Sequence, residues 1–407
     1  MERIILHCVI NNCYTSIECA ENPELKGKPV IVCDSTDDPH CIVLAKSPEA
    51  KKYGIQTGET LWQAKMKNPD LITVNPQFNV YTRYSQAIRN IYYRFTDKIE
   101  SSGLNECWLD ITNSIKSFGS VPYLATLIKN TVKKEMGVTI SIGVSFNKVF
   151  SKIASGLTKD NSIKYIDRKN YKKEIWNLSI NKLPGVKGET LRKLNKMHIK
   201  SIGDIANETK ITLEKFLGKK GALLWEYANG LDNSIVSDCD VSTPVKSVGH
   251  GITIQKDMNN NDDVWQLIFA LSDTVGKKLE SNRIAASKVQ ITIRDCQQTN
   301  HEFQCVLATP TQNPASLSRQ IFSHFKKNYT WNNNIRSISI RAIELVPYAA
   351  PYQFNKCGNI EKDKKSTNKE SLLDKLQNRF GAKLINYGIL LYDSSHYSFD
   401  KAQAKCV

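Results

Sequence analysis

The residues with the clearest capacity for chemistry lie in the stretch 102–112, which reads SGLNECWLDIT. Its pattern predicts a tight β-hairpin, in which one strand ends near Gly103, a polar turn holds Asn105 and Glu106, and a second strand covers 107–111. The hairpin tip then carries an amide and a carboxylate above a sheet, where a metal or a phosphate could bind. An ordinary turn containing asparagine fits the same residues. The hairpin alone leaves both interpretations open.

Basic residues are concentrated in the stretch 183–206, LPGVKGETLRKLNKMHIKSIGDIA. A glycine-containing turn between two helical patterns predicts a helix–hairpin–helix, a motif whose helix N-termini approach a DNA phosphate. Helical domains also carry lysines on solvated faces without binding any ligand, so this pattern alone allows either explanation. The basic residues concerned are Lys187, Arg192, Lys193, Lys196 and Lys200.

The whole chain has the charge of a protein that binds a polyanion. Its 56 Lys and Arg residues exceed its 40 Asp and Glu residues, which gives a formal net charge of +16. This surplus favours nucleic acid first and an anionic membrane surface second, with solubility alone as the alternative. Arg336 and Arg341 in RSISIRAIEL alternate with apolar residues, a pattern that presents basic side chains to a phosphate backbone.

The composition is that of an ordinary globular protein of 407 residues, with 41% apolar and 24% charged residues. This length predicts two to four compact domains. No apolar run approaches the roughly 18–20 residues that a membrane span needs, and the N-terminal MERIILHCVI predicts a first strand rather than a signal peptide. The 11 cysteines form no CxxC pair and no zinc spacing, so we expect free thiols in a reducing cytoplasm.

The elements that must position the hairpin form an α+β unit. When 11–78 is set aside, the predicted order is β-α-β-β-α-β, which is that of a ferredoxin-like fold. This order brings residues near position 9 beside 105–106 on one surface. Outside the hairpin, apolar periodicity predicts strands over 4–10 and 138–144 and helices over 81–99, 121–134 and 147–157.

The remaining segments differ in character. Residues 11–78 contain short elements, and residues 168–233 have a helical pattern. Residues 234–244 show no hydrophobic period, which predicts a linker. From 355 onward a charged run of low apolar content predicts a flexible tether. The short elements are strands over 28–34 and 41–45 and helices over 50–53 and 60–67. A second α+β domain follows the linker, with strands over 248–254, 288–294, 301–307 and 337–346 and helices over 262–279 and 315–327.

Taken together, several blocks resemble the Y-family, or translesion, DNA polymerases of bacteria, and the resemblance covers nearly the whole chain. It implies an α+β multidomain, right-hand polymerase that transfers a nucleotide from a dNTP to a primer on template DNA, in DNA repair. The blocks are ILHCVINNCYTSIE, LAKSPEAKKYGIQTG, ECWLDIT, GVSFNKVFSKIAS and KSVGHGIT. The implied parts are a ferredoxin-like βαββαβ palm (1–10 and 79–166), inserted fingers (11–78), a helical thumb (167–233), a linker (234–244), an α+β little finger (245–348) and a tether and tail (349–407).

The family's metal site is where this chain departs most. The resemblance implies two Mg²⁺ ions held by three carboxylates, one at the end of the first strand and an Asp-Glu pair at the hairpin tip. Those positions are Val9, Asn105 and Glu106, so only Glu106 keeps its carboxylate. The backbone carbonyl of Ile10 remains an available ligand, whereas Asp110 belongs to the family pattern as a structural residue. We therefore expect weak or absent Mg²⁺ binding and impaired polymerase activity.

The positions for nucleotide binding agree better with the family. Tyr14 occupies the steric-gate position, where the resemblance implies an aromatic ring against the sugar; a core tyrosine is the alternative. Lys51 and Lys159 stand where the family places basic residues on the triphosphate. Lys148 and Lys152 follow the family's helix pattern, and a place on the solvated side of that helix explains them equally well.

Further departures follow Lys159 and occur in the thumb. The family usually has proline and glycine where Asp160 and Ser162 stand, and an acidic residue where Gly156 stands. Lys187 and His198 replace glycines of the hairpin turn, and a side chain at a turn that needs positive φ costs stability.

A sliding clamp is the weaker candidate partner. Residues 351–357, PYQFNKC, lie where many relatives carry a clamp-binding peptide, but Gln353 is followed only by Phe354, without the spaced apolar anchors.

Three functions fit this sequence: an active translesion polymerase, a catalytically inactive relative that binds primer–template DNA or a partner polymerase, and a decayed copy. A nucleotidyl cyclase shares the palm topology, but this sequence contains no GGDEEF-like hairpin, and that function would leave the thumb and little finger unexplained. We expect a Y-family fold that retains binding of DNA and dNTP, with polymerisation impaired.

Overall fold

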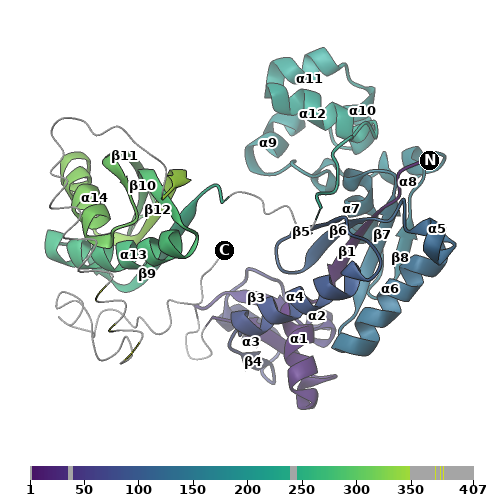
Figure 1. Ribbon diagram of the computed structural model, residues 1–407, viewed down its shortest axis with the longest axis horizontal. Coiled ribbons are helices and arrows are strands. Elements are labelled where there is room, and N and C mark those ends of the chain that lie inside the picture. The colour runs from purple at the N-terminus through teal and green to yellow at the C-terminus, as the bar shows by residue number, and fades with distance from the viewer. Residues whose placement is uncertain are drawn as a thin grey trace. The chain divides into compact units, whose positions relative to one another are not determined.

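The computed structural model describes residues 2–34, 40–238 and 245–348, together with positions 372, 376 and 379. The chain divides into two compact units, 1–242 and 243–407, which are described separately (Figure 1). The predicted tether and the clamp-like peptide with Gln353 and Phe354 lie outside the described residues. None of the helices in this described part is long and apolar enough to cross a lipid bilayer.

The first unit is built around a five-stranded sheet in the order β5-β6-β1-β7-β8. Nearly every residue of β1 is buried, as expected of a central strand covered on both faces. The predicted ferredoxin-like β-α-β-β-α-β unit is confirmed, and β8 adds a short parallel strand beside β7. The elements are β1 (Ile5–Ile10), α4 (Phe78–Tyr93), β5 (Ile99–Ser102), β6 (Glu106–Asp110), α6 (Val121–Met136), β7 (Ile140–Ser145) and β8 (Ile163–Tyr165), with a short α5 (Ile115–Phe118) before α6.

Helices cover both faces of this sheet. Leu6 and Cys8 of β1 share a core with Ile88 of α4 and Ile128 of α6. On the other face lies α7 (Lys148–Leu157), which begins with an Asn147 side chain that accepts a hydrogen bond from the Phe150 N–H at 2.7 Å. α7 approaches β7 so closely that a Cβ on Gly143 would lie 2.0 Å from the Ser151 carbonyl oxygen. Only glycine is compatible with that approach.

Residues 11–78 form an insertion after β1 with its own small sheet, in the order β3-β2-β4. The third strand was not predicted, because its three residues are too few to show a period. A capping box of Thr60 and Gln63 begins α3, where the Thr60 side chain accepts from the Gln63 N–H. The elements are α1 (Cys13–Glu21), η1 (Pro23–Leu25), β2 (Val30–Cys33), β3 (Val43–Lys46), α2 (Pro48–Lys52), α3 (Leu61–Lys67) and β4 (Ile72–Val74).

The segment after β8 is helical, as predicted, and has its own core, which includes Ile180, Leu194 and Leu224. Ser201 and Asp204 form a capping box at the start of α10. The elements are α8 (Tyr171–Ile175), η2 (Ile180–Lys182), α9 (Gly188–Lys196), α10 (Ile202–Asn207), α11 (Lys210–Leu217) and α12 (Lys219–Ala228).

The second unit is an antiparallel sheet in the order β11-β10-β12-β9 with two helices packed on one face. Its element order is again β-α-β-β-α-β, but here the second and fourth strands are central, whereas in the first unit the first and third are. The same order of elements therefore gives two different sheets. The elements are β9 (Val248–Met258), α13 (Asn261–Ser281), β10 (Ile284–Asp295), β11 (Asn300–Thr311), α14 (Pro314–Asn328) and β12 (Ile335–Pro347).

Two predicted boundaries near the hairpin were wrong. The helix predicted over 81–99 ends at Tyr93, and Ile99 begins β5 opposite Leu109. A turn intervenes because the Thr96 hydroxyl donates to the Asp110 carbonyl at 2.7 Å and accepts from the Lys98 N–H at 3.2 Å. Glu106, predicted in the turn, is the first residue of β6. No disulfide joins the cysteines that the structure describes.

Candidate active site and nucleic-acid interface

The end of β1 and the hairpin tip meet on one surface. Val9 pairs directly with Glu106 in the antiparallel ladder, and the Ile10 N–H donates to the Asn105 carbonyl at 2.9 Å. Directly opposed residues of an antiparallel pair place their side chains on the same face of the sheet. The structure therefore brings the three predicted metal positions together, as the sequence implied.

This arrangement has few metal ligands. Val9 offers no ligating atom, Asn105 offers a neutral amide oxygen, and only Glu106 carries a carboxylate. Mg²⁺ prefers charged and carbonyl oxygens in octahedral geometry. Among the residues that the structure describes, no group of three or more His, Cys, Asp or Glu side chains could hold a metal ion. The residues present do not fit a two-metal centre.

The Glu106 carboxylate is instead paired within the protein. Its Oε2 lies 2.6 Å from Lys152 Nζ and 3.4 Å from His7 Nε2. Contact with His7, reinforced by Lys152, lowers the pKa of Glu106 to about 2. Burial lowers the pKa of His7, whose Nδ1 lies 2.7 Å from the Ser155 hydroxyl. Glu106 is thus anionic at neutral pH, and its charge is matched by an internal ammonium.

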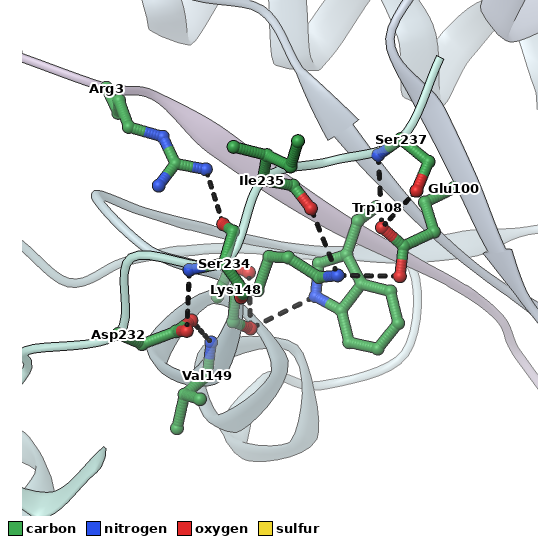
Figure 2. A network of polar contacts seen from close by, with 10 residues as sticks. Arg3, Glu100, Trp108, Lys148, Val149, Asp232, Ser234, Ile235 and Ser237 are labelled. Atoms are coloured by element: carbon green, nitrogen blue, oxygen red, sulfur yellow. Dashed lines mark hydrogen bonds and ion pairs between the residues drawn. The ribbon is translucent and has the colours of Figure 1, made fainter. Parts of the chain in front are cut away.

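Lys148 and Lys152 do not line the solvated side of α7. Both ammonium groups lie over the Trp108 ring, at 4.8 and 5.1 Å from its centroid. Lys148 Nζ also lies 2.6 Å from Glu100 Oε1, and the indole N–H of Trp108 donates to the Lys148 carbonyl (Figure 2). The interpretation as solvated lysines was wrong, because these residues join α7 to β5 and β6.

The segment that follows the thumb is fastened to this same surface (Figure 2). Glu100 Oε2 accepts from the Ser237 N–H at 3.1 Å and from its hydroxyl at 3.3 Å. Asp232 accepts from the Val149 N–H at the start of α7, at 3.4 Å, and Arg3 donates to the Ser234 carbonyl at 2.7 Å. Residues 232–237 therefore form a clasp on the palm, although 234 onward was predicted to be a linker.

Asp110 has a structural role, as expected. One of its carboxylate oxygens accepts hydrogen bonds from the Thr112 N–H and hydroxyl, and the other lies 4.0 Å from Arg3. These contacts close the end of β6.

Tyr14 lies on α1, half-buried against an aromatic cluster. Its ring stacks on Tyr81 with centroids 4.5 Å apart and meets Phe78 edge-on. The Tyr81 hydroxyl donates to buried Glu18, whose second oxygen accepts from Gln77 at 3.0 Å. Sequence reasoning missed Glu18 and Tyr81, because the helical period marks both only as inward-facing.

Lys51 on α2 and Lys159 after α7 are both exposed. The loop of Lys159 is held to the end of β1 by Asp160, which accepts from the side-chain amides of Asn11 at 3.3 Å and Asn12 at 3.2 Å. Sequence reasoning noted Asp160 only as a departure. The hydrogen bonds show that it fixes this loop where the resemblance implies a proline.

The prediction for the thumb turn was half right. Lys187 has an extended backbone (φ −148°), so it does not occupy a positive-φ position. The positive φ values of this turn belong to Gly185 and Gly188. His198 does have positive φ (59°), as predicted. Lys187, Arg192 and Lys193 are exposed on or beside α9, and Lys193 pairs with Glu189 at 2.8 Å.

A second helix junction was not predicted: Gly218 alone joins α11 to α12, and Gly221 lies in the first turn of α12. A Cβ on Gly221 would lie 2.0 Å from the Leu213 carbonyl oxygen, so the helices meet closely there. The repeated Gly-x-x-Gly spacing in 185–188 and 218–221 was the signal that could have revealed it.

In the second unit, Arg336 and Arg341 are exposed on β12. Arg341 lies opposite Gly249 of β9 and Gln290 of β10, on the sheet face away from the helices. Arg336 follows buried Ile335 at a register shift and lies 3.1 Å from Asp257. Only Arg341 therefore lies in the regular part of the open face.

Family models match three parts of the chain. The impB/mucB/samB family matches 8–156, its C-terminal domain matches 245–355, and the DNA polymerase-iota thumb domain matches 181–232. A DNA polymerase IV of Acetivibrio thermocellus is 40% identical over 97% of this chain and 98% of its own length. The chain belongs to the Y family of DNA polymerases. The predicted family, the right-hand α+β fold and the assignment to translesion synthesis in DNA repair are thereby confirmed.

Two further relatives agree with this family. A DNA polymerase IV of Clostridium acetobutylicum is 30% identical over 96% of this chain and 99% of its own. Among solved structures, a "Y-family DNA polymerase chimera Dbh-Dpo4(243-245)-Dbh" is similar with a TM-score of 0.75 at 22% identity, covering 84% of this chain and 99% of that one. Y-family polymerases bind DNA and use divalent metals, which makes the composition of the metal site in this chain decisive.

Proposed function

We propose that this Y-family protein binds primer–template DNA and a dNTP but extends primers at least about a thousandfold more slowly than an intact polymerase. A loss of ~4 kcal/mol of transition-state stabilisation suffices for that factor. The observation that carries the proposal is the pairing of Val9 with Glu106 at the end of β1, where a single carboxylate remains. That carboxylate is already neutralised by Lys152 at 2.6 Å.

Mg²⁺ is the ion expected at this site, and we propose that it is bound weakly or not at all. A polymerase-type pair of ions shares ligands, so each lost carboxylate weakens both. The Ile10 carbonyl, which lies on the hairpin side of β1, supplies one neutral ligand, and Asn105 another. One anion and two neutral oxygens leave most of the charge of two divalent ions unbalanced.

DNA binding rests on groups that are independent of the metal site. The thumb presents Lys187, Arg192 and Lys193 beside the α9 turn, and the second unit presents Arg341 on an open sheet face. The net charge of +16 agrees with binding to a polyanion. Within the nucleotide pocket we assign Tyr14 to the sugar and Lys51 and Lys159 to the phosphates. We also propose a cytoplasmic location, where bacterial DNA lies, and a sliding clamp as a weaker candidate partner.

The test is primer extension in Mg²⁺ and in Mn²⁺ by the unmodified chain and by Val9→Asp/Asn105→Asp. The double variant should recover extension, and each single variant should not, because the two ions share ligands and the effects are non-additive. Val9→Ala/Asn105→Ala is the matched control, since it perturbs the same positions without adding a carboxylate. Primer–template affinity, measured by anisotropy, should be equal in all variants within about threefold.

Robust extension by the unmodified chain in Mg²⁺ would refute the impaired-polymerase proposal. The folded double variant could bind DNA and still fail to extend primers. In that case, residues other than the metal ligands would also prevent catalysis. That result would favour a DNA-binding accessory role, which the intact basic thumb also supports. Absence of both binding and recovery would favour a decayed copy.

A further inference from the structure

The edge strand of the second unit borders an open groove. β11 lies at one end of the sheet order, and the outer side of this strand faces α14. The groove encloses a cavity of about 310 Å³. Its lining residues are Cys305, Arg319, Gln320, Ser323, His324 and Lys327.

The direction of the β11 backbone follows from the adjoining hairpin. The Asp295 N–H donates to the Thr299 carbonyl at 3.1 Å, and the ladder continues in the same register to Cys305 opposite Val289. Because antiparallel pairs alternate, odd-numbered residues of β11 bond to β10 and even-numbered ones point away as far as Val306, after which the register shifts. The N–H and C=O groups of Gln304 and Val306 therefore point out of the sheet.

Beyond the register shift that follows Val306, α14 covers the edge of β11. The Ala308 N–H donates to the Gln320 side-chain oxygen at 2.9 Å, so α14 satisfies one outward N–H. Edge strands are commonly protected by lysine, proline or a bulge. In β11 these devices lie at its end, where the ladder to β10 shifts register after Val306 and Pro310 follows. The regular stretch 301–306, HEFQCV, has neither lysine nor proline, and Val306 is 74% exposed.

The α14 wall of the groove is basic. Arg319 and Lys327 lie eight residues apart on one row of the helix, or about 12 Å at ~1.5 Å per residue. Neither takes part in an ion pair within the described part of the chain, and both are exposed. In an extended strand, residues four apart lie about 13 Å from each other on the same face. The two cations thus match carboxylates at positions i and i+4 of a strand.

We propose that this groove binds an extended acidic segment of a partner protein, which adds a strand to β11 and sets two carboxylates, four residues apart, against Arg319 and Lys327. A peptide is favoured over DNA by the backbone of β11. Its outward groups alternate between donors and acceptors, and a peptide strand matches both, whereas a phosphate backbone offers acceptors only.

The test uses the full chain and a fluorescent nine-residue peptide of Thr and Val with Glu at positions 3 and 7. A second peptide carries Glu at positions 3 and 6, which have equal charge but lie on opposite faces of a strand. Anisotropy at ~50 mM salt should show about two- to fivefold tighter binding of the first peptide, the value of one exposed ion pair. Equal binding of the two peptides would overturn the proposal.

Two variants test the two walls of the groove. Val306→Pro removes an outward N–H without disturbing the ladder to β10, and it should weaken binding about tenfold or more. Arg319→Glu/Lys327→Glu should do the same through charge. Lys326→Glu is the matched control, because Lys326 lies on the same helix over Phe322 and not in the groove.

Native circular dichroism and an unchanged Tm in Val306→Pro keep the result interpretable. Should that variant misfold, the unmodified chain is tested with the first peptide N-methylated at alternate residues, with the same weakening expected. Retained peptide binding by the folded charge-reversal variant would overturn the proposal. Two results together would also overturn the proposal. Equimolar duplex DNA would displace the peptide, and the charge-reversal variant, but not Lys326→Glu, would lose affinity for DNA. The groove would then be part of the DNA interface.

Discussion

The clasp of 232–237 on the palm should depend on one carboxylate, that of Glu100. It lies 2.6 Å from Lys148 Nζ and accepts two hydrogen bonds from Ser237, at 3.1 and 3.3 Å. The Lys148 and Glu100 side chains are only 14% and 27% exposed, so solvent screens the pair incompletely. Glu100→Gln keeps the shape of the side chain but removes the charge from all three contacts.

The expected cost follows from these contacts. A hydrogen bond to a charged group contributes about 1.5–3 kcal/mol, and a neutral amide retains part of it. We therefore expect the clasp to open about 2 kcal/mol more easily in Glu100→Gln, which corresponds to about a 30-fold change in its opening equilibrium. Asp232 and Arg3 still hold the start of the segment, so the loss should be greatest at Ser237.

Native-state hydrogen exchange with mass spectrometry measures this directly. Peptides covering 232–238 should lose about 30-fold protection in Glu100→Gln, while peptides covering β1 should exchange as before. Glu135→Gln is the control, because it breaks the Arg94 ion pair on the palm surface without touching the clasp. Unchanged protection of 232–238, or an equal loss across β1, would refute the assignment of Glu100 as the fastening residue.

Three further outcomes are expected. His198→Gly should raise the free energy of unfolding by about 1 kcal/mol in urea titration, because glycine adopts a φ of 59° without strain; a loss of stability would contradict this. The pKa of Glu106 is about 2 in the folded chain, against 4.5 for an ordinary glutamate. This difference adds to the free energy of unfolding above pH ~4.5, and the added stability is lost as the pH falls toward ~2. Glu106→Gln should remove that part of the acid-unfolding curve, at most about 2 kcal/mol after allowance for solvent screening, and an unchanged curve would contradict the pairing. Arg192→Ala should lower the salt slope of primer–template binding by about 1 with little change in sequence preference, whereas an unchanged slope would remove Arg192 from the interface.

The local sequence pattern was sufficient for the palm and for the position of the candidate site. Alternation in 107–111 and the apolar run at 4–10 identified both strands, and the β-α-β-β-α-β order brought position 9 next to 105–106. The identities of Val9 and Asn105 alone are enough to question the metal centre, because ligand chemistry is a property of the residue type.

What the sequence by itself could not decide depends on contacts between distant segments. The directions of Lys148 and Lys152 depend on Trp108, some 40 residues earlier, and the clasp of 232–237 depends on Glu100. The extended conformation of Lys187 likewise could not be predicted, because the positive φ values of this turn fall on Gly185 and Gly188.

The two sheets give the physical reason. Periodicity fixes which side chains share a face of a strand or helix, because it reflects local backbone geometry. It does not fix which strands pair, and the same β-α-β-β-α-β order produced central first and third strands in one unit and central second and fourth strands in the other. Strand order, and with it the free edge of β11, is decided by nonlocal packing and hydrogen bonding, which only the tertiary structure contains.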